Sequence, residues 1–402
     1  MADVRPFPAL RPRDDLAGEV IAPPYDVLTE AEARDLAKNK RSFVQVTRPE
    51  ATMRKGTDPH SDAAYQRARK NLDALVETGA LQQDEAPTYY FYGQRMGQHH
   101  QVGVIAAASV EEYDRGQIRK HEHTRPDKED DRTHHMEVLD VQVGLVFLTY
   151  RATNTLRALT AKVTALEPAW RVTTEDEVEH TLWPAPPDMI DRIRAGFARA
   201  ETLYIADGHH RSAAASRVHA NRQDEQSATF LAGLYPDDQL QVLAYNRVVK
   251  DLHGHEPEAF LDLVQTFFTV LPHSEPQPPE RGSFTMYFQG DWHLLSPRPG
   301  LFDEADPVAR LDVSVLQDHL LAPILGIEDP RTSDRIAFVG GIRGHQALRR
   351  AVDEEGAAVA FHLYPTGLDQ LFEVADAGLV MPPKSTWFEP KLREGVAIRS
   401  LK

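Results

Sequence analysis

Two periodicities in the hydrophobic and polar positions along the chain predict a mixture of helices and strands. Residues 29–39 have helical spacing, with Thr29 as the expected N-cap and Glu32 three positions later as its capping-box partner. Residues 61–80 predict a second, amphipathic helix. One face of that helix has apolar side chains only: Ala64, Ala68, Leu72, Leu75 and Val76.

Short runs of aromatic and β-branched residues predict strands between the helices. Residues 87–96 and 98–110 meet at Gly97-Gln98, which favours a β-hairpin. Residues 141–150 are almost continuously apolar and predict one buried strand. Later segments repeat the mixture, with strands expected at 202–207, 228–236 and 240–249, a hairpin at 284–296, and helices at 256–270 and at 312–325 with Asp312 as N-cap.

Hairpins interspersed with scattered helices favour an α+β fold, with mixed or antiparallel sheets and packed helices, over a doubly wound sheet. The length of 402 residues indicates more than one domain. We expect an N-terminal α+β region at residues 1–150, a core at 151–270, and a C-terminal α+β lobe at 271–402 packed on that core.

Composition excludes several classes of protein. Asp and Glu outnumber Lys and Arg by 61 to 45, a net charge of −16. An acidic surface repels nucleic acid, although a local basic pocket for one nucleotide remains compatible with it. The absence of Cys excludes disulfides, thiolate metal sites and a Cys nucleophile, and fits a reducing cytoplasm. We expect no signal peptide and no membrane span, and the aromatic strands are compatible with a homodimer.

The clearest candidate site is the run from the apolar residues 204–206 through a turn into an Ala-rich helix. Gly208 permits a sharp turn, and the N–H groups that begin a helix attract anions. Cations are unfavourable at a helix N-terminus unless an anion lies among them. Six residues would therefore bind a phosphate: Asp207, Gly208, His209, His210, Arg211 and Ser212. The alternative is a structural turn followed by a solvated first helical turn.

A dense charged segment, residues 119–135, has three interpretations. In the first, Glu122 or an Asp acts as a general base or Mg²⁺ ligand, and Lys and Arg side chains bind phosphates. In the second, the histidines of residues 121–135 bind a transition metal in a hydrolase. In the third, the segment is an ordinary solvated loop or helix face.

Two Pro-rich segments are weaker candidates. In residues 381–388, Lys384 precedes Ser and Thr as in a P-loop, but the Gly-rich loop is missing. Lys384 is either a phosphate contact or part of a packing segment. In residues 22–27, two prolines hold Tyr25 and Asp26 rigidly, either for a site or in a stiff surface turn.

Together these segments resemble a known family. The motifs RPFPALRP, APPYDV, HEHT…DR, YIADGHHR, LDVSVLQ and MPPKSTWFEPKL resemble the DUF1015 family of bacteria and archaea, from near residue 3 to about residue 395. The turn at residues 207–211 is similar to the phosphate-binding box of the ParB/sulfiredoxin superfamily, which includes CTP-binding partition proteins, sulfiredoxins and free-serine kinases. Sulfiredoxins have Cys where His209 stands here, so their chemistry is not expected.

The resemblance implies a small-molecule kinase that transfers a phosphoryl group from ATP or ADP, with Mg²⁺, to a hydroxyl such as that of free serine. Residues 207–212, with Arg132 and Lys384 as auxiliary contacts, would bind the phosphates. Glu122 is the first candidate for the proton acceptor and Asp26 the second, with His209 also among the catalytic candidates. Two alternatives stay open: a non-enzymatic regulator that binds CTP or ATP, and the metal-dependent hydrolase.

Overall fold

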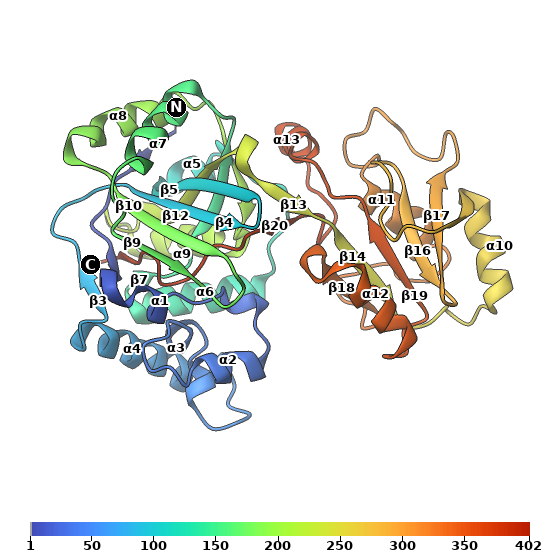
Figure 1. The fold of residues 1–402 in the computed structure, drawn as a ribbon, viewed down its shortest axis with the longest axis horizontal. Coiled ribbons are helices and arrows are strands. Elements are labelled where there is room, and N and C mark those ends of the chain that lie inside the picture. The colour runs from blue at the N-terminus through green and yellow to red at the C-terminus, as the bar shows by residue number, and fades with distance from the viewer. Residues whose placement is uncertain (1) are drawn as a thin grey trace. The chain divides into compact units, whose positions relative to one another are not determined.

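The computed structural model describes residues 2–402, which form two compact units (Figure 1). The first unit contains residues 2–120, 124–240 and 390–402. The second contains residues 121–123 and 241–389. Because the chain leaves the first unit after residue 240 and returns at residue 390, most of the second unit is an insertion in the first.

A nine-stranded mixed sheet forms the centre of the first unit, in the order β6-β11-β8-β12-β5-β4-β10-β9, with β1 paired to β5. Most pairs are antiparallel, but β12 runs parallel to β8 and β11 parallel to β6. The mixed sheet with packed helices confirms the α+β class. The strands are β1 (Val4–Arg5), β4 (Tyr90–Met96), β5 (His99–Ser109), β6 (Ile118–Arg119), β8 (Val146–Tyr150), β9 (Trp170–Thr173), β10 (Glu179–Pro184), β11 (Leu203–Asp207) and β12 (Thr229–Pro236).

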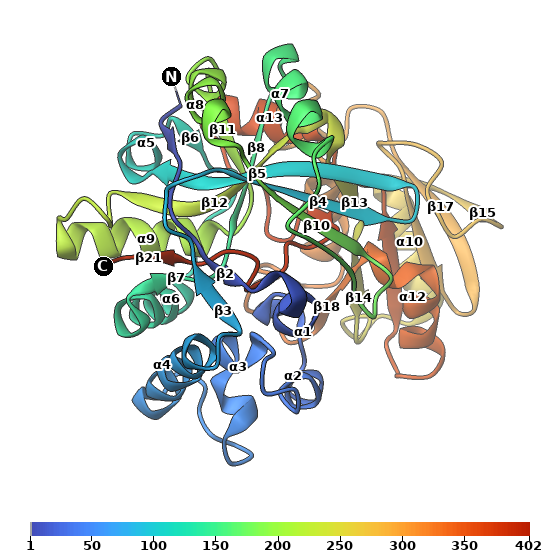
Figure 2. The same cartoon turned by 60° about the vertical axis from the view of Figure 1, so that its left-hand side comes forward.

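Helix α9 packs on this sheet, α6 packs on α9, and α4 packs on α6 (Figure 2). Small side chains such as Ala214 let α9 pack closely on the sheet, and Leu72 of α4 lies in a second core. Among residues 2–402, no helix has both the length and the apolar composition that a membrane crossing requires. The helices are α1 (Ala17–Val20), α2 (Glu30–Leu36), α3 (Val44–Thr47), α4 (Asp62–Glu77), α5 (Val110–Asp114), α6 (Pro126–Leu139), α7 (Asn154–Thr164), α8 (Ile190–Phe197) and α9 (His209–Arg222).

Local sequence signals at the first helices are confirmed. Thr29 Oγ1 accepts a hydrogen bond from Glu32 N at 3.3 Å, and Glu32 Oε2 accepts one from Thr29 N at 2.8 Å. The expected apolar face of α4 is buried with one exception, since Val76 is 44% exposed. Val76 follows Leu75 by one position, a rotation of about 100° around a helix, which turns it away from the core.

The single strand expected at residues 141–150 is wrong. Val141 and Gln142 form β7, which pairs with β21 (Arg399–Ser400), and β8 begins only at Val146. Gly144 lies between them against the Arg211 side chain, and a Cβ there would be 3.0 Å from Arg211 Nε. The division expected at residue 150 falls inside the large sheet, because β8 pairs with β12 on the other side of that boundary.

The second unit contains a six-stranded antiparallel sheet in the order β15-β17-β16-β19-β14-β18. The hairpin expected at residues 284–296 is confirmed as β16 and β17. The helix expected to reach residue 270 ends at Phe267, and the division expected there lies within β15. The elements are β14 (Tyr245–Val249), α10 (Pro257–Phe267), β15 (Phe268–His273), β16 (Phe284–Phe288), β17 (Asp291–Pro297), α11 (Asp312–Leu316), β18 (Ile336–Gly340), α12 (Gly344–Asp353), β19 (Val359–Leu363) and α13 (Leu368–Asp376).

Three two-stranded ribbons complete the fold. In the first unit, β2 (Leu10–Pro12) pairs with β3 (Leu81–Gln83), and β7 (Val141–Gln142) pairs with β21. In the second unit, β13 (Gln241–Leu243) pairs with β20 (Trp387–Glu389). The last ribbon therefore joins the two ends of the inserted segment.

The N-cap expected at Asp312 is wrong. Leu311 precedes α11, and Asp312 is its first residue, where Oδ1 accepts a hydrogen bond from Gly282 N at 3.0 Å. The side chain therefore connects the start of α11 to the loop that contains Gly282, and does not cap its own helix. Asp312 is only 8% exposed, and burial raises the pKa of its carboxyl to about 7.

Replacing this buried acid with its neutral isostere, Asp312→Asn, is expected to stabilise the second unit at about pH 8. The folded-state carboxyl binds its proton more tightly than the unfolded one does, so stability falls as pH rises from 3.8 to about 7. Asparagine keeps the acceptor for Gly282 N without the buried charge, and should gain about 1–3 kcal/mol at about pH 8. Thermal unfolding at about pH 8 and about pH 4 measures this, and an equal effect at both would contradict it.

Candidate functional site

The turn at residues 207–211 connects β11 to α9 in the first unit. Gly208 has φ 93°, and a Cβ there would lie 3.3 Å from the Cα of Val146. Gly208 N donates to Asp207 Oδ1 at 2.7 Å, while Gly208 O accepts from Arg211 N at 2.9 Å. Helix α9 therefore starts directly after a left-handed glycine, with its N-terminus at the end of a buried strand. This geometry suits an anion.

Arg211 folds back from α9 over the loop that precedes β8. Its Nη1 donates to Leu145 O at 2.7 Å, and its Nη2 lies 3.9 Å from Glu394 Oε1. The guanidinium carbon is 5.6 Å from the centre of the Tyr25 ring, and the side chain is only 13% exposed. Arg211 is thus a largely buried cation.

A second guanidinium contacts the same tyrosine. The Arg132 guanidinium, from α6, lies 4.1 Å from the centre of the Tyr25 ring. Arg132 also donates two hydrogen bonds to Asp131 Oδ2, at 2.9 and 2.6 Å. Burial raises the pKa of the Tyr25 hydroxyl, although the charge of Arg132 opposes the shift. Two arginines from different helices are therefore gathered at one phenol ring.

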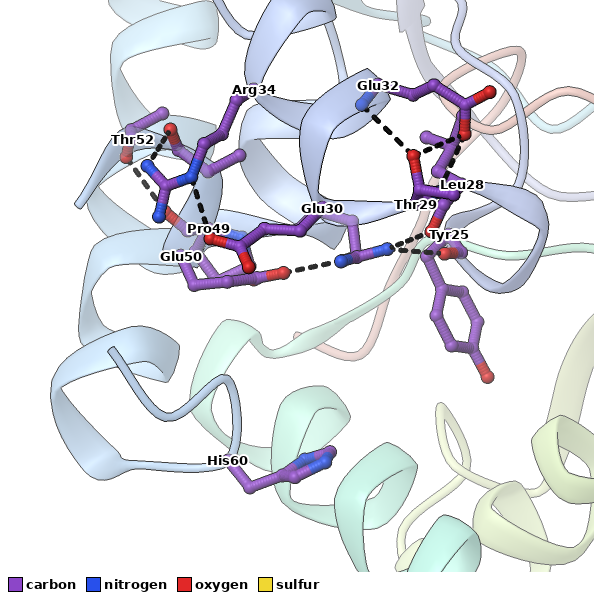
Figure 3. A network of polar contacts seen from close by, with 12 residues as sticks. Tyr25, Leu28, Thr29, Glu30, Glu32, Arg34, Pro49, Glu50, Thr52 and His60 are labelled. Carbon is purple, nitrogen blue, oxygen red and sulfur yellow. Dashed lines mark hydrogen bonds and ion pairs between the residues drawn. The ribbon is translucent and has the colours of Figure 1, made fainter. Parts of the chain in front are cut away.

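Arg48 holds the turn that contains Tyr25 through backbone carbonyl groups. Arg48 Nη1 donates to Tyr25 O at 3.0 Å and to Leu28 O at 2.8 Å, and its Nε pairs with Glu50. Figure 3 shows these contacts, with the Tyr25 ring pointing away from them. Pro24 precedes the short 3₁₀ helix η2 (Tyr25–Val27), and Asp26 on this helix is exposed. The prolines were expected to hold Tyr25 and Asp26 rigidly. The hydrogen bonds from Arg48 hold the same turn in addition.

The end of the chain completes this region. Lys391 Nζ lies 2.8 Å from Asp207 Oδ2, so it holds the carboxylate of the turn. Burial would raise the pKa of Asp207, but the charges of Lys391 and Arg211 outweigh burial and lower it. Glu394 pairs with Ala22 through two backbone hydrogen bonds, of 3.0 and 2.9 Å. This bridge brings the end of the chain beside the Pro-rich segment that leads to Tyr25.

Asp131 organises the contacts behind Arg132. Its Oδ1 accepts from the Tyr65 hydroxyl at 2.7 Å and lies 2.9 Å from His60 Nδ1, while its Oδ2 binds Arg132. Burial opposes ionisation, but Arg132, Tyr65 and His60 together lower the pKa of Asp131 to about 2. His60, seen in Figure 3, precedes α4. His60 and Tyr65 thus hold the carboxylate that orients Arg132.

The structure brings together part of the set expected from the sequence. The first unit contains the residues expected around the phosphate-binding turn, along with Asp26 and Arg132. His210 Nδ1 accepts from Arg125 N at 3.4 Å. The Ser212 hydroxyl is fully buried and donates to His209 O at 2.9 Å, so it stabilises the first turn of α9.

Two expected residues belong to the second unit. Glu122 lies in the short stretch 121–123 assigned to that unit. Lys384 has φ 59°, and its Nζ lies 5.6 Å from the centre of the Tyr245 ring. Its carbonyl accepts from Arg247 Nη2 at 3.1 Å. Lys384 therefore packs within the second unit, and its role as a phosphate contact stays a prediction.

Most of the charged segment is helical, and part of it is buried. Residues 126–139 form α6, with Asp131, Arg132, Thr133 and His135 buried. The Nε2 of His135 lies 3.2 Å from Val46 O, and burial lowers the pKa of this imidazole to about 4. The His134 ring packs edge-on against Tyr65 at 4.5 Å. Neighbouring positions on a helix face different directions, so these two histidines do not share one metal.

Residues 4–314 match the model of a protein family of unknown function, DUF1015. The match does not reach the motif MPPKSTWFEPKL at residues 381–392, so the resemblance expected as far as about residue 395 is confirmed only to residue 314. The chain belongs to the DUF1015 family. No curated protein matches this DUF1015 protein.

Solved structures that resemble this DUF1015 protein include a free serine kinase in complex with AMP. It is 12% identical, with a TM-score of 0.37 over 71% of this chain and 87% of that one. SbnI with a C-terminal truncation from Staphylococcus aureus is 11% identical, with a TM-score of 0.38 over 72% and 84%. A conserved hypothetical protein from Pyrococcus furiosus is 10% identical, with a TM-score of 0.35 over 71% and 90%. Similarity at this level assigns no activity to this chain.

Sequence reasoning missed Lys391 and Glu394. Lys391 lies within the motif MPPKSTWFEPKL, but no periodicity or spacing connects it with Asp207, which is far away along the chain. Glu394 stands between Arg393 and Gly395 in an ordinary polar stretch. The one signal was Gly395 itself, since a glycine directly after an acidic residue can mark a sharp backbone turn.

Proposed function

We propose that the first unit of this DUF1015 protein binds the phosphate groups of a nucleotide at the Gly208 turn and transfers a phosphoryl group to a small hydroxyl compound. The observation that supports this most directly is the state of Arg211. Among residues 2–402, its guanidinium makes one hydrogen bond, to the carbonyl of Leu145, and its ion pair with Glu394 is long, at 3.9 Å. A buried guanidinium is usually satisfied by a two-pronged acceptor, and a phosphate is one.

Arg132 supports the same proposal. Asp131 holds it rigidly, and its guanidinium lies on the Tyr25 ring that also faces Arg211. Phosphoryl transfer needs mainly positioning and neutralisation of the charge on the transferred group. Two oriented guanidinium groups near a helix N-terminus meet both requirements.

The donor and the acceptor follow from the resemblance of residues 207–211 to the superfamily box, which points to ATP or ADP and to free serine. Mg²⁺ in such enzymes is held by substrate phosphates and one or two carboxylates. Asp26 is exposed and is close enough to Arg211 to raise the pKa of that side chain, so it is a suitable carboxylate. The ion would add positive charge beside the phosphates.

The test is a binding and product assay on the full chain. ATP, ADP, CTP and pyrophosphate, each with Mg²⁺, are titrated by calorimetry, and each nucleotide is then incubated with serine and related hydroxy compounds. We expect ATP or ADP to bind and a new phosphomonoester to form. Binding without any product would indicate the nucleotide-binding regulator instead. A chain that binds none of these ligands would refute the site.

A further inference from the structure

We propose that Glu394 is the catalytic residue that takes up the proton of the acceptor hydroxyl. The inference rests on the proposed function and names a residue that the sequence did not single out. The candidates from the sequence for this role were Glu122 and Asp26, and Asp26 is exposed on η2. Glu394 belongs to the first unit and lies beside the arginine that would bind the phosphate.

The backbone fixes Glu394 at this place. Its N–H and C=O both bond to Ala22, directly before the two prolines that lead to Tyr25. Gly395 follows with φ 78°, and a Cβ there would lie 2.7 Å from Cγ of the buried Phe43. The carboxyl group is therefore positioned by contacts on both sides, as a reacting group has to be.

One oxygen of the Glu394 carboxyl, Oε2, can accept a further hydrogen bond. Glu394 is 2% exposed, and within residues 2–402 its Oε2 forms no hydrogen bond of ordinary geometry. The hydroxyl of Thr47, from α3, interacts with the same carboxyl and lowers its pKa, but the contact falls outside ordinary hydrogen-bond geometry. Buried carboxylates are normally hydrogen-bonded, because an unsatisfied one costs free energy. A carboxylate oxygen has two lone pairs, so Oε2 can accept a hydrogen bond from an incoming hydroxyl group as well as from Thr47.

The surrounding charges suit a base that works near neutral pH. The groups that face Glu394 are Arg211 from α9, Arg132 from α6, Asp26 and Tyr25 from η2, and Thr47 from α3. Burial raises the pKa of Glu394 to about 7, although Arg211 opposes the shift. A general base is most effective when its pKa lies near the working pH.

The proposed step transfers the terminal phosphoryl group of the nucleotide to the acceptor hydroxyl. The oxygen of the acceptor hydroxyl forms a bond to the terminal phosphorus of the nucleotide, while the bond from that phosphorus to the bridging oxygen breaks. The bridging oxygen leaves with the electron pair of the broken bond, as part of the shortened nucleotide. The hydroxyl proton moves to Oε2 of Glu394, and Arg211 faces the transferred group.

The test compares Glu394→Gln with Glu112→Gln, a control that removes a half-buried carboxylate from α5 of the same unit. We expect E394Q to lower kcat at least about 100-fold while changing the nucleotide Kd by less than about threefold. E112Q should leave kcat within about threefold of wild type. An E394Q variant that keeps its kcat, or that loses nucleotide binding together with kcat, would overturn the inference.

A second measurement needs no variant. In the wild-type protein, kcat should rise with pH, because the base has to be ionised, and a flat profile would overturn the role of Glu394. The two measurements distinguish a wrong assignment of Glu394 from a wrong proposal for the function. A wild-type chain that binds ATP or ADP but yields no phosphomonoester refutes the kinase itself, whereas turnover that is independent of Glu394 refutes only this assignment.

Discussion

Replacing Arg211 with methionine should weaken binding of ATP or ADP about 100-fold. Methionine fills much of the same volume but removes the charge and the two-pronged donor, and charge-assisted hydrogen bonds of this kind contribute about 1.5–3 kcal/mol each. Arg211→Lys should restore only part of the affinity, because an ammonium group lacks the planar fork. Isothermal titration with each nucleotide and Mg²⁺ measures the change.

The matched control is Arg217→Met on the same helix. Arg217 is 44% exposed, and its guanidinium pairs with Glu129 and Asp130 on the surface. Because exposed ion pairs contribute about 0–1 kcal/mol, this change should leave nucleotide affinity within about twofold of wild type. Equal losses in both variants would point to a general effect of net charge, and an unchanged affinity in R211M would rule out Arg211 as the phosphate contact.

The largest effect on stability is expected from Gly395→Ala. The residue has φ 78°, a conformation that costs any side chain about 1–2 kcal/mol. The new Cβ would also lie 2.7 Å from Cγ of Phe43, which is fully buried. Overpacking of this kind typically adds about 1–3 kcal/mol, so we expect the first unit to lose about 3 kcal/mol in the free energy of unfolding.

The control Gly56→Ala separates the cost of backbone strain from the cost of steric overlap. Gly56 has φ 82°, but nothing lies within 4 Å of the position of its Cβ. This control has the backbone strain without the steric overlap and should cost about 1–2 kcal/mol. Chemical denaturation of both variants measures the difference. Equal losses would show that Phe43 yields to the new methyl group, and that the backbone at Glu394 is less constrained than the structure indicates.

The elements that sequence patterns predicted best are those defined by local chemistry. The capping box of Thr29, the apolar face of α4 and the hairpin of β16 and β17 all depend on residues a few positions apart. The predictions that were wrong involved distant partners. The run 141–150 is interrupted at Gly144, where the Arg211 side chain packs, and Asp312 bonds to Gly282 across a loop.

Sequence patterns were enough to identify the family, the α+β class and the sharp turn at Gly208, because motifs, hydrophobic periodicity and turn residues depend on neighbouring positions. The contacts among Tyr25, Arg132, Arg211 and Glu394 became visible only in the folded chain. These residues lie on four segments that are far apart in sequence, and packing of α6 and α9 beside the sheet brings them together. The return of the chain at residue 390 supplies the last of them. Local patterns contain no information on such long-range contacts, since the free energy that selects them comes from burial of the whole core.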